Sequence, residues 1–414
     1  MSTHVPGPGN HAPDPGTPAT GGHGLGAHAS GTPGPGNHAS GGPGTSAPQA
    51  PVGRKAALNG TLSLRPRGLW LVTSLELRQR IRSKRWFIAL GVWTLVLLGI
   101  GALGLGPTML AASWGDVEST AAVIFSLQLI LVLFAMLMVV PALSAGSING
   151  DRTAGTLATL QASLISALEI VLGKLLAGFL TGMAFLVLAL PSLIPIALLG
   201  RIGPLYFFSC VMVIVLLTLC VTAVGLGLSA VTNRQLGSVV LAYAVVFGVT
   251  VVLPFTWASS AFFLEQDREV TRYSYAVSDS QRDPDRCEAY TDTRSVVRVD
   301  LSLPLLWGNP VVLLAEPSPS IPAWSSGEDE GNVDVLRLIK TGMRYAATVT
   351  HPAHENECRP DMEGYPEHLA QVPNRPVWPM GMGLWLLAGA GSVAIATWRL
   401  AVPIKRLGAG TRIA

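Results

Sequence analysis

Six long stretches of this 414-residue chain contain no Asp, Glu, Lys or Arg. A helix needs about 20 mostly apolar residues to cross the ~30 Å hydrocarbon core of a membrane, and each stretch reaches that length. The stretches lack the alternation of a barrel strand, and a helix satisfies its own backbone groups without water. The sequence therefore predicts an all-α polytopic membrane protein with six transmembrane helices, within residues 86–106, 119–150, 175–200, 202–233, 235–264 and 376–398.

The overall composition agrees with a membrane protein. Only 13% of the residues are charged and 49% are hydrophobic. A typical soluble domain has about 25% charged residues. The alternative, six buried helices of a soluble core, does not require runs of this length without a charge.

The basic residues indicate how the spans are oriented. With the N-terminus inside, nearly all Lys and Arg of the short segments face the cytoplasm, and Arg201 is the exception in the short outer loops. Cytoplasmic loops carry such an excess, whereas long segments such as 265–375 cross the membrane regardless of charge. We therefore predict a multi-pass plasma-membrane protein with both termini in the cytoplasm.

The chain divides into four parts. Residues 1–60 form a Gly/Pro/His-rich tail in which the unit PGPGNHA occurs twice, and its composition predicts disorder. Residues 61–263 form a transmembrane domain with a basic helix and spans one to five. Residues 264–378 are too long and too charged for a connector and are interpreted as an extracellular domain. Residues 379–414 hold the sixth span and a basic C-terminal tail.

Residues 69–85 precede the first span and are predicted to form a basic amphipathic helix. One face is apolar and holds Trp70, Thr73, Leu77 and Ile81. A second face holds Arg78, Arg82 and Arg85. Glu76 is spaced to pair with Arg80 one turn later. Such a helix lies at the membrane boundary with its arginines on anionic lipid headgroups, and simple positive-inside anchoring is the alternative.

The predicted extracellular part contains two cysteines, Cys287 and Cys358. Because that side of the membrane is oxidising, we expect a disulfide, which would stabilise the fold by roughly 4 kcal/mol, and two free thiols are the alternative. Residues 332–349 have helical periodicity. The apolar residues 304–315 are too short to span and are expected at the outer membrane surface.

The sequence shows no catalytic constellation. A GxGxxG match at 99–104 lies inside the first span rather than between a strand and a helix, so it indicates helix packing and not nucleotide binding. Gly173 and Lys174 lack the other residues of a phosphate-binding loop. We expect a protein that is not an enzyme, with no cofactor and no metal site, and without nucleic acid as a partner.

The spans also lack the features of a secondary carrier. Ion-coupled carriers keep ionisable groups along their path and often have broken helices in matching positions, and neither is visible here. A secondary carrier or channel is therefore the weakest functional interpretation. Energy for any transport is expected to come from outside the chain.

Residues 147–174, SINGDRTAGTLATLQASLISALEIVLGK, connect the second and third spans and are expected to face the cytoplasm. Asn149 and Gly150 are expected to form a turn. Thr153 or Thr156 would then cap a short helix with one apolar stripe, formed by Leu157, Leu160 and Leu164. A helix with such a stripe outside the bilayer needs a partner, which is either the lipid surface or a soluble subunit.

The same segment resembles the permease subunits of ABC type-2 exporters, which show a pattern like E-R-x-x-G-T-L-x-x-L-x-x-T-P-L-S-x-x-E-I-x-x-G-K at this place. The matching positions are Asp151, Arg152, Gly155, Thr156, Leu157, Leu160, Ser163, Ser166, Glu169, Ile170, Gly173 and Lys174. Asp151 replaces the usual Glu, and Leu164 replaces the usual Pro. The resemblance extends over about residues 69–407, because the basic helix is similar to the family's connecting helix and Asn309 with Pro310 to a segment before the last span.

The resemblance implies a permease subunit of an ATP-driven exporter. Two permease subunits, as a homodimer or heterodimer, form the pathway, and two separate ATPase subunits bind on the cytoplasmic side. The implied ATPase-coupling residues are Asp151, Arg152, Gly155, Thr156, Leu157, Leu160, Glu169, Gly173 and Lys174, and the connecting-helix residues are Glu76, Arg78 and Arg82. A membrane sensor or scaffold that reads an extracellular signal is the second hypothesis, because it would share the same coupling segment.

Overall fold

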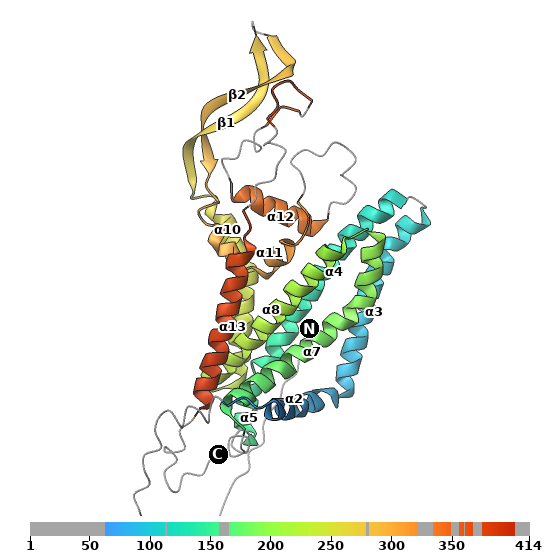
Figure 1. The fold of residues 1–414 in the computed structure, drawn as a ribbon, viewed down its shortest axis with the longest axis vertical. Helices are drawn as coiled ribbons and strands as arrows, with labels where there is room; N and C mark the ends of the chain where they lie inside the picture. Colours follow the sequence, from blue (N-terminus) through green and yellow to red (C-terminus); the bar gives the residue numbers. More distant parts are fainter. Residues whose placement is uncertain are drawn as a thin grey trace, which may run out of the picture. The chain divides into compact units, whose positions relative to one another are not determined.

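A computed structural model describes residues 63–111, 114–156, 165–278, 281–320, 334–348, 356–359, 361–366 and 375–401. The described part is mostly helical, and six of its helices are long and apolar enough to cross a membrane, as the sequence predicts (Figure 1). The predicted N-terminal tail, residues 1–60, lies outside the described residues.

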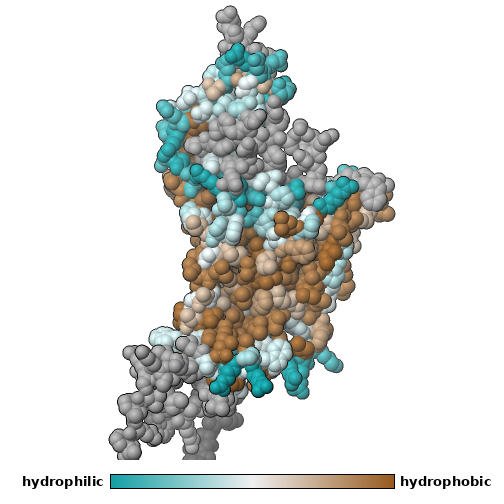
Figure 2. All heavy atoms as spheres, in the orientation of Figure 1, coloured by the Kyte–Doolittle hydropathy of each residue, from teal (hydrophilic) through white to brown (hydrophobic). Residues whose placement is uncertain are grey.

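The spans form a bundle around α8. They are α3 (Lys84–Leu110), α4 (Trp114–Ser144), α7 (Ala167–Leu199), α8 (Pro204–Val231), α9 with α10 (Gln235–Phe247 and Leu253–Ser260) and α13 (Trp378–Leu400). α8 packs against α4, α7, α9 and α13. On the face shown in Figure 2, hydrophobic residues gather over the long helices and hydrophilic residues lie at their ends. An apolar surface of this extent needs lipid or another protein as its neighbour.

Glycines let the spans approach closely. A Cβ at Gly178 would lie 2.8 Å from Cγ2 of Thr222, on α8. A Cβ at Gly227 would lie 2.6 Å from the Cβ of Ser392, on α13. Small residues at helix crossings in membranes allow two backbones to pack directly.

The fifth span is not one continuous α-helix. α9 ends at Phe247, the π-helical segment η1 (Gly248–Val252) follows, and α10 begins at Leu253. This break is not visible in the sequence, because a change of hydrogen-bond register leaves the hydropathy of the run unchanged.

The segment after the fifth span forms a β-hairpin, so the all-α prediction is wrong here. β1 (Glu265–Ser278) pairs antiparallel with β2 (Gln281–Val297). A signal was present in the sequence, because Thr271, Tyr273 and Tyr275 alternate with other residues, and β-branched and aromatic residues favour strands. The charges around them obscured it, since much of the hairpin is exposed to water on both faces.

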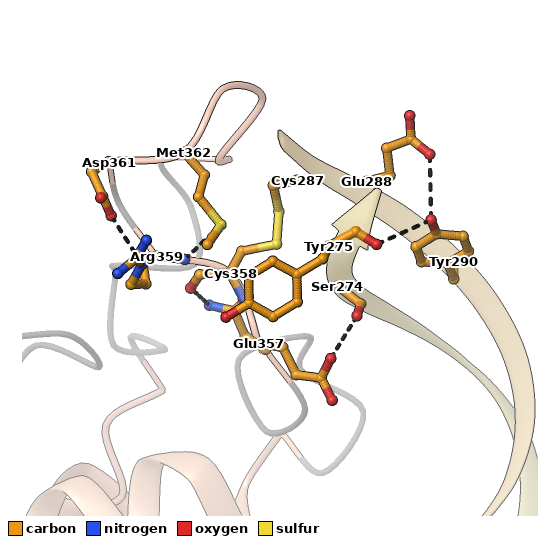
Figure 3. Close-up of a disulfide and its surroundings, with 11 residues drawn as sticks. Ser274, Tyr275, Cys287, Glu288, Tyr290, Glu357, Cys358, Arg359, Asp361 and Met362 are labelled. Atoms are coloured by element: carbon orange, nitrogen blue, oxygen red, sulfur yellow. Dashed lines mark hydrogen bonds and ion pairs between the residues drawn. A yellow bond between two sulfur atoms is a disulfide. The ribbon is translucent and has the colours of Figure 1, made fainter. Parts of the chain in front are cut away.

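A disulfide joins β2 to the segment that precedes the sixth span. Cys287 and Cys358, the pair expected from the sequence, are bonded, with their Cα atoms 5.8 Å apart (Figure 3). Tyr273 and Tyr275 of β1 pack against this bond. Tyr273 also forms an isolated parallel bridge with Asn356. The bond and the bridge therefore brace the hairpin against a distant part of the chain.

Three short elements complete the part between the fifth and sixth spans: η2 (Leu303–Leu306), α11 (Pro310–Ala315) and α12 (Val335–Ala346). α12 lies inside the predicted helical region and buries Leu336 and Met343. α11 lies within the apolar stretch 304–315, whose place at the outer membrane surface stays a prediction. It packs against α4, α8 and α13 and buries Leu313 and Leu314 completely.

Gly227→Ala is expected to destabilise the bundle, because the new methyl group would collide with α13 at Ser392. Overpacking of this kind typically costs about 1–3 kcal/mol. The thermal unfolding midpoint of the protein in nanodiscs should fall. Gly391→Ala, where the new methyl group has no atom within 4 Å in the described residues, is the matched control. Equal midpoints for the two variants would contradict the close helix contact.

Candidate functional site

After α4 the chain forms a short helix, α5 (Ser147–Thr153), before it turns toward the third span. α5 contains Asn149 and Gly150, which were expected in a turn. The turn follows later, at Gly155, which has a φ of +70°. Glycine adopts this left-handed conformation without the strain that a side chain would cause. Asp151 therefore belongs to a helix attached to the second span.

The two threonines of this segment bond back to α5. The Thr153 hydroxyl donates to the carbonyl of Asn149 at 3.2 Å, and a cap by Thr153 or Thr156 on a following helix stays a prediction, because that helix would lie outside the described residues. The Thr156 hydroxyl donates to the carbonyl of Asp151 at 3.4 Å. The predicted apolar stripe lies outside the described residues, and so the coupling helix stays a prediction for Leu157, Leu160 and Leu164.

The third span begins with a capping box. Ser166 Oγ accepts from the Glu169 N–H at 3.1 Å, and Glu169 Oε2 accepts from the Ser166 N–H at 2.9 Å. Glu169 Oε1 also accepts from the N–H of Arg65 at 2.6 Å, at the start of α2 (Pro66–Ile81). Glu169 is only 1% exposed. Its carboxylate therefore joins α7 to α2 and does not face an outside partner.

α2 corresponds to the predicted basic helix, and the bundle buries only part of the predicted apolar face. Val72, Thr73 and Glu76 are buried. Trp70 and Ile81, both on the predicted apolar face, are exposed. The helix ends at Ile81, before the predicted end at residue 85, and α3 follows as a separate helix. The contact with α7 therefore buries one apolar residue of α2, Val72, together with the polar residues Thr73 and Glu76.

Gly173 makes the contact between α2 and α7 possible. A Cβ at this position would lie 2.7 Å from the Cβ of Val72. The carbonyl of Gly173 accepts a hydrogen bond from the Thr73 hydroxyl at 3.3 Å. The glycine of the family pattern thus allows α2 to lie directly on the backbone of the third span.

Buried charges join α2, α5 and α7. The ammonium of Lys174 donates a hydrogen bond to Glu76 Oε1 and lies 2.6 Å from Asp151 Oδ2, an ion pair without the alignment of a hydrogen bond. The side chain of Lys174 is 1% exposed and that of Glu76 11%. Arg80 lies 3.9 Å from the Glu76 carboxylate, the i,i+4 spacing noted in the sequence. Each buried charge has an opposite charge beside it, which offsets the cost of removing it from water.

Arg80 extends this charged cluster to the second span. Its Nη2 donates to the carbonyl of Leu143 at 3.3 Å, near the end of α4. Burial lowers the pKa of the Arg80 guanidinium, and the Glu76 carboxylate opposes that effect.

The other predicted residues lie on the outward surface of the same end. Arg152, Gly155 and Thr156 are exposed. Arg78 and Arg82 are exposed on α2. A hollow of about 330 Å³ on this face of α2 is lined by Leu71, Ser74, Leu75, Arg78, Gln79 and Arg82.

Sequence reasoning missed the residues that tie α5 to the neighbouring spans. Ser229 Oγ, on α8, accepts from the N–H groups of Ile148 and Asn149, both at 3.2 Å. Asn149 Nδ2 donates to Thr232 Oγ1 at 3.0 Å and to Ser238 Oγ, on α9, at 3.4 Å. Asn149 is 1% exposed. An amide between apolar residues was the available signal, because a buried amide needs partners.

A family model described as ABC-2 family transporter protein matches residues 70–310. The match covers more than half of the chain, from α2 through the charged cluster to the start of α11. The chain belongs to the ABC-2 transporter family. It is a multi-pass membrane protein and the permease component of an ABC transporter, and the family in general implies an ABC ATPase as partner. A search of the curated proteins finds no match to the chain.

In this ABC-2 permease, the pattern between the second and third spans divides into two groups. The structure brings Asp151, Gly173 and Lys174 together with Glu76 in the interior contact of α2, α5 and α7. Glu169 lies one turn away and bonds the start of α2. Arg152, Gly155 and Thr156 remain on the surface. Neighbouring residues of one motif thus have different structural tasks.

Lys174→Met is expected to destabilise the permease strongly, because the carboxylates of Glu76 and Asp151 would be left without the cation between them. Removing one partner of a buried ion pair typically costs about 3–5 kcal/mol. The thermal unfolding midpoint in nanodiscs should fall much further than for the control Lys174→Arg, which keeps the charge. Similar midpoints for the two variants would show that the ion cluster does not stabilise this end of the bundle.

Proposed function

We propose that this permease takes up the movement of a separate cytoplasmic ABC ATPase at residues 147–174 and uses it to export a substrate across the plasma membrane. The observation that carries the proposal is the buried cluster of Glu76, Asp151 and Lys174, which joins three elements from separate parts of the chain. A buried polar network whose members are paired holds a defined geometry. A displacement of α5 is therefore passed on to α2 and to the third span.

The contact surface for the ATPase is formed by residues that the bundle leaves exposed. Arg152 lies in the last turn of α5, Gly155 and Thr156 follow this helix, and Leu157 and Leu160 would continue this surface. Asp151 receives a different role from the one implied by the family resemblance. Because its carboxylate pairs with Lys174, it supports the turn from behind instead of contacting the ATPase.

The outward face of α2 suits a helix at the lipid boundary. Leu71 and Leu75 are exposed beside Arg78 and Arg82 along one hollow. Apolar side chains at this boundary enter the lipid while arginines bind anionic headgroups. α2 would thus fix the depth of the charged cluster relative to the membrane surface. It would also support the ATPase contact.

In this proposal α2, α5 and both termini face the cytoplasm, and residues 264–378 form an extracellular domain. The excess of Arg and Lys around α2 supports this orientation. The disulfide supports it as well, because disulfides persist on the oxidising side of the membrane. The fifth span is the least buried of the six, so it leaves an apolar surface for lipid or for the second permease subunit of a homodimer or heterodimer.

A sensor or scaffold without cargo transport is the second candidate. It is favoured by the disulfide-braced hairpin, which is larger than a connection between two spans requires. Liposomes that contain the permease and its ATPase distinguish the two. ATP-dependent loss of a lipid or peptide cargo from the donor side supports export, whereas a response of ATPase activity to ligands of the hairpin alone supports sensing.

Gly155→Trp is expected to weaken ATPase binding about tenfold or more, which corresponds to about 1.4 kcal/mol. The bulky side chain would sit on the exposed turn, and Gly155 also needs its positive φ. The ABC ATPase that co-purifies with wild type is identified first, and the measurement is the amount of it that co-purifies with each variant. Gly203→Trp, before α8 at the other end of α7, is the matched control and should retain the ATPase. Equal recovery with both variants would remove the docking role.

The orientation is tested by cysteine labelling. A cysteine at Gly155 should react with a membrane-impermeant maleimide only after the cells are permeabilised, and a cysteine at Thr293 of β2 should react in intact cells. Cys210 and Cys220 are buried and Cys287 and Cys358 are bonded, so the background should be low. Labelling of position 155 from outside would overturn the proposed function.

A further inference from the structure

The break in the fifth span has a local cause, Pro254. Proline has no N–H, so it removes the donor that the carbonyl four residues earlier would have in an α-helix, and five residues earlier in a π-helix. These carbonyls belong to Thr250 and Val249, both within η1. In a membrane no water replaces the missing donor, and another part of the protein has to supply it.

Asn309 supplies that donor from the segment before α11. Its Nδ2 lies 3.2 Å from the carbonyl oxygens of both Val249 and Thr250. Its Oδ1 accepts from the N–H groups of Val311 and Val312, at 2.9 and 3.2 Å, and so caps α11. Asn309 is 3% exposed. One side-chain amide thus satisfies the backbone on both sides of the contact.

The outer half of the fifth span is bonded to the same region at two more places. Trp257 Nε1 donates to the carbonyl of Val299 at 3.2 Å. The hydroxyls of Ser260 and Ser302 are 2.7 Å apart. α10 is therefore tied to the chain between β2 and α11, where η2 packs against it.

The inner half has different neighbours. Ser238 and Ala242 are the buried residues of α9. Ser238 accepts a hydrogen bond from Asn149, on α5, at 3.4 Å. The Tyr243 hydroxyl donates to the carbonyl of Met138, on α4, at 2.7 Å. α9 is thus in contact with the segment that the proposed function assigns to ATPase coupling.

We propose that Asn309 is the positioning residue of a hinge in the fifth span. It holds the Pro254 break and the outer half to α11, while the inner half follows α5. The hinge divides the span at η1, where the α-helical ladder is already interrupted. The source of the movement rests on the proposed function, whereas the hydrogen bonds of Asn309 do not.

The positioning role is tested with a variant that keeps the cap of α11 by Asn309 but loses its hydrogen bonds to the η1 carbonyls. Asn309→Ser keeps a cap acceptor for α11, since serine is a good N-cap, but its side chain is too short to reach the η1 carbonyls. We expect a lower thermal unfolding midpoint in nanodiscs and faster amide hydrogen exchange across residues 248–256 than in wild type.

Pro254→Ala is the compensating variant. It restores an N–H that can bond these carbonyls. The double variant Asn309→Ser, Pro254→Ala should therefore regain most of the wild-type unfolding midpoint and of the protection from hydrogen exchange. Pro204→Ala is the matched control, because Pro204 lies at the start of α8, where a missing N–H deprives no carbonyl. Wild-type exchange in Asn309→Ser, or rescue by Pro204→Ala as well, would overturn the role of Asn309.

The hinge itself is tested in the complex with the ATPase. Spin labels at Leu236, on the exposed inner end of α9, and at Leu387, exposed on α13, report the distance between these helices. We expect an ATP-dependent change in wild type that is lost in Pro254→Ala. An unchanged response in Pro254→Ala would overturn the hinge. If no ATPase binds to wild type, the proposed function fails, while the exchange experiment still decides the role of Asn309.

Discussion

Inside a lipid bilayer, an N–H or carbonyl group that finds no partner within the protein has no water to take that place. This constraint accounts for the helices, and it also accounts for the exceptions to them. Pro254 interrupts the ladder of the fifth span, and the amide of Asn309 fills the gap from another segment. Glu169 does the same at the start of the third span, where it bonds Ser166 and Arg65. The polar residues of the bundle lie where backbone groups need them.

Buried charges at one end of the bundle also require partners within the protein. Lys174 enters the interior only because Glu76 and Asp151 accompany it. The three residues come from α7, α2 and α5, so the requirement for pairing also fixes how these elements meet. The outward residues of the same motif, Arg152 at the end of α5 and Gly155 on the turn after it, are exposed beside this cluster. Under the proposed function, one short motif would both join three helices and offer a surface to an ATPase.

The proposed path of movement connects these two features. α5 is bonded to α8 and α9 through Asn149, and α9 leads to the π-helical segment that Asn309 holds. Displacement at the turn would reach the third span through the charged cluster and the fifth span through Asn149. The outer segment, braced by the bond between Cys287 and Cys358, would remain the fixed reference.

Much of the fold was predictable from the sequence because it depends on local composition. The six expected stretches form helices long and apolar enough to cross a membrane, since a run of apolar residues is sufficient to require a helix in lipid. The pairing of Glu76 with Arg80 followed from helical spacing. The hairpin was missed because the alternation of Thr271, Tyr273 and Tyr275 is short and surrounded by charges. The turn was placed at Asn149, too early, because asparagine and glycine favour turns in isolation.

The sequence by itself determined that this chain has six segments long and apolar enough to cross a membrane, that Cys287 and Cys358 can pair, and that the segment before the third span carries a family motif. These properties reside in residue type and spacing. Only the tertiary structure decided which motif residues face inward, because Asp151, Glu169 and Lys174 find partners that are distant along the chain. It alone also decided which side chain bonds the carbonyls that Pro254 leaves without a donor. A missing N–H is visible in the sequence, but the side chain that replaces it is chosen by packing.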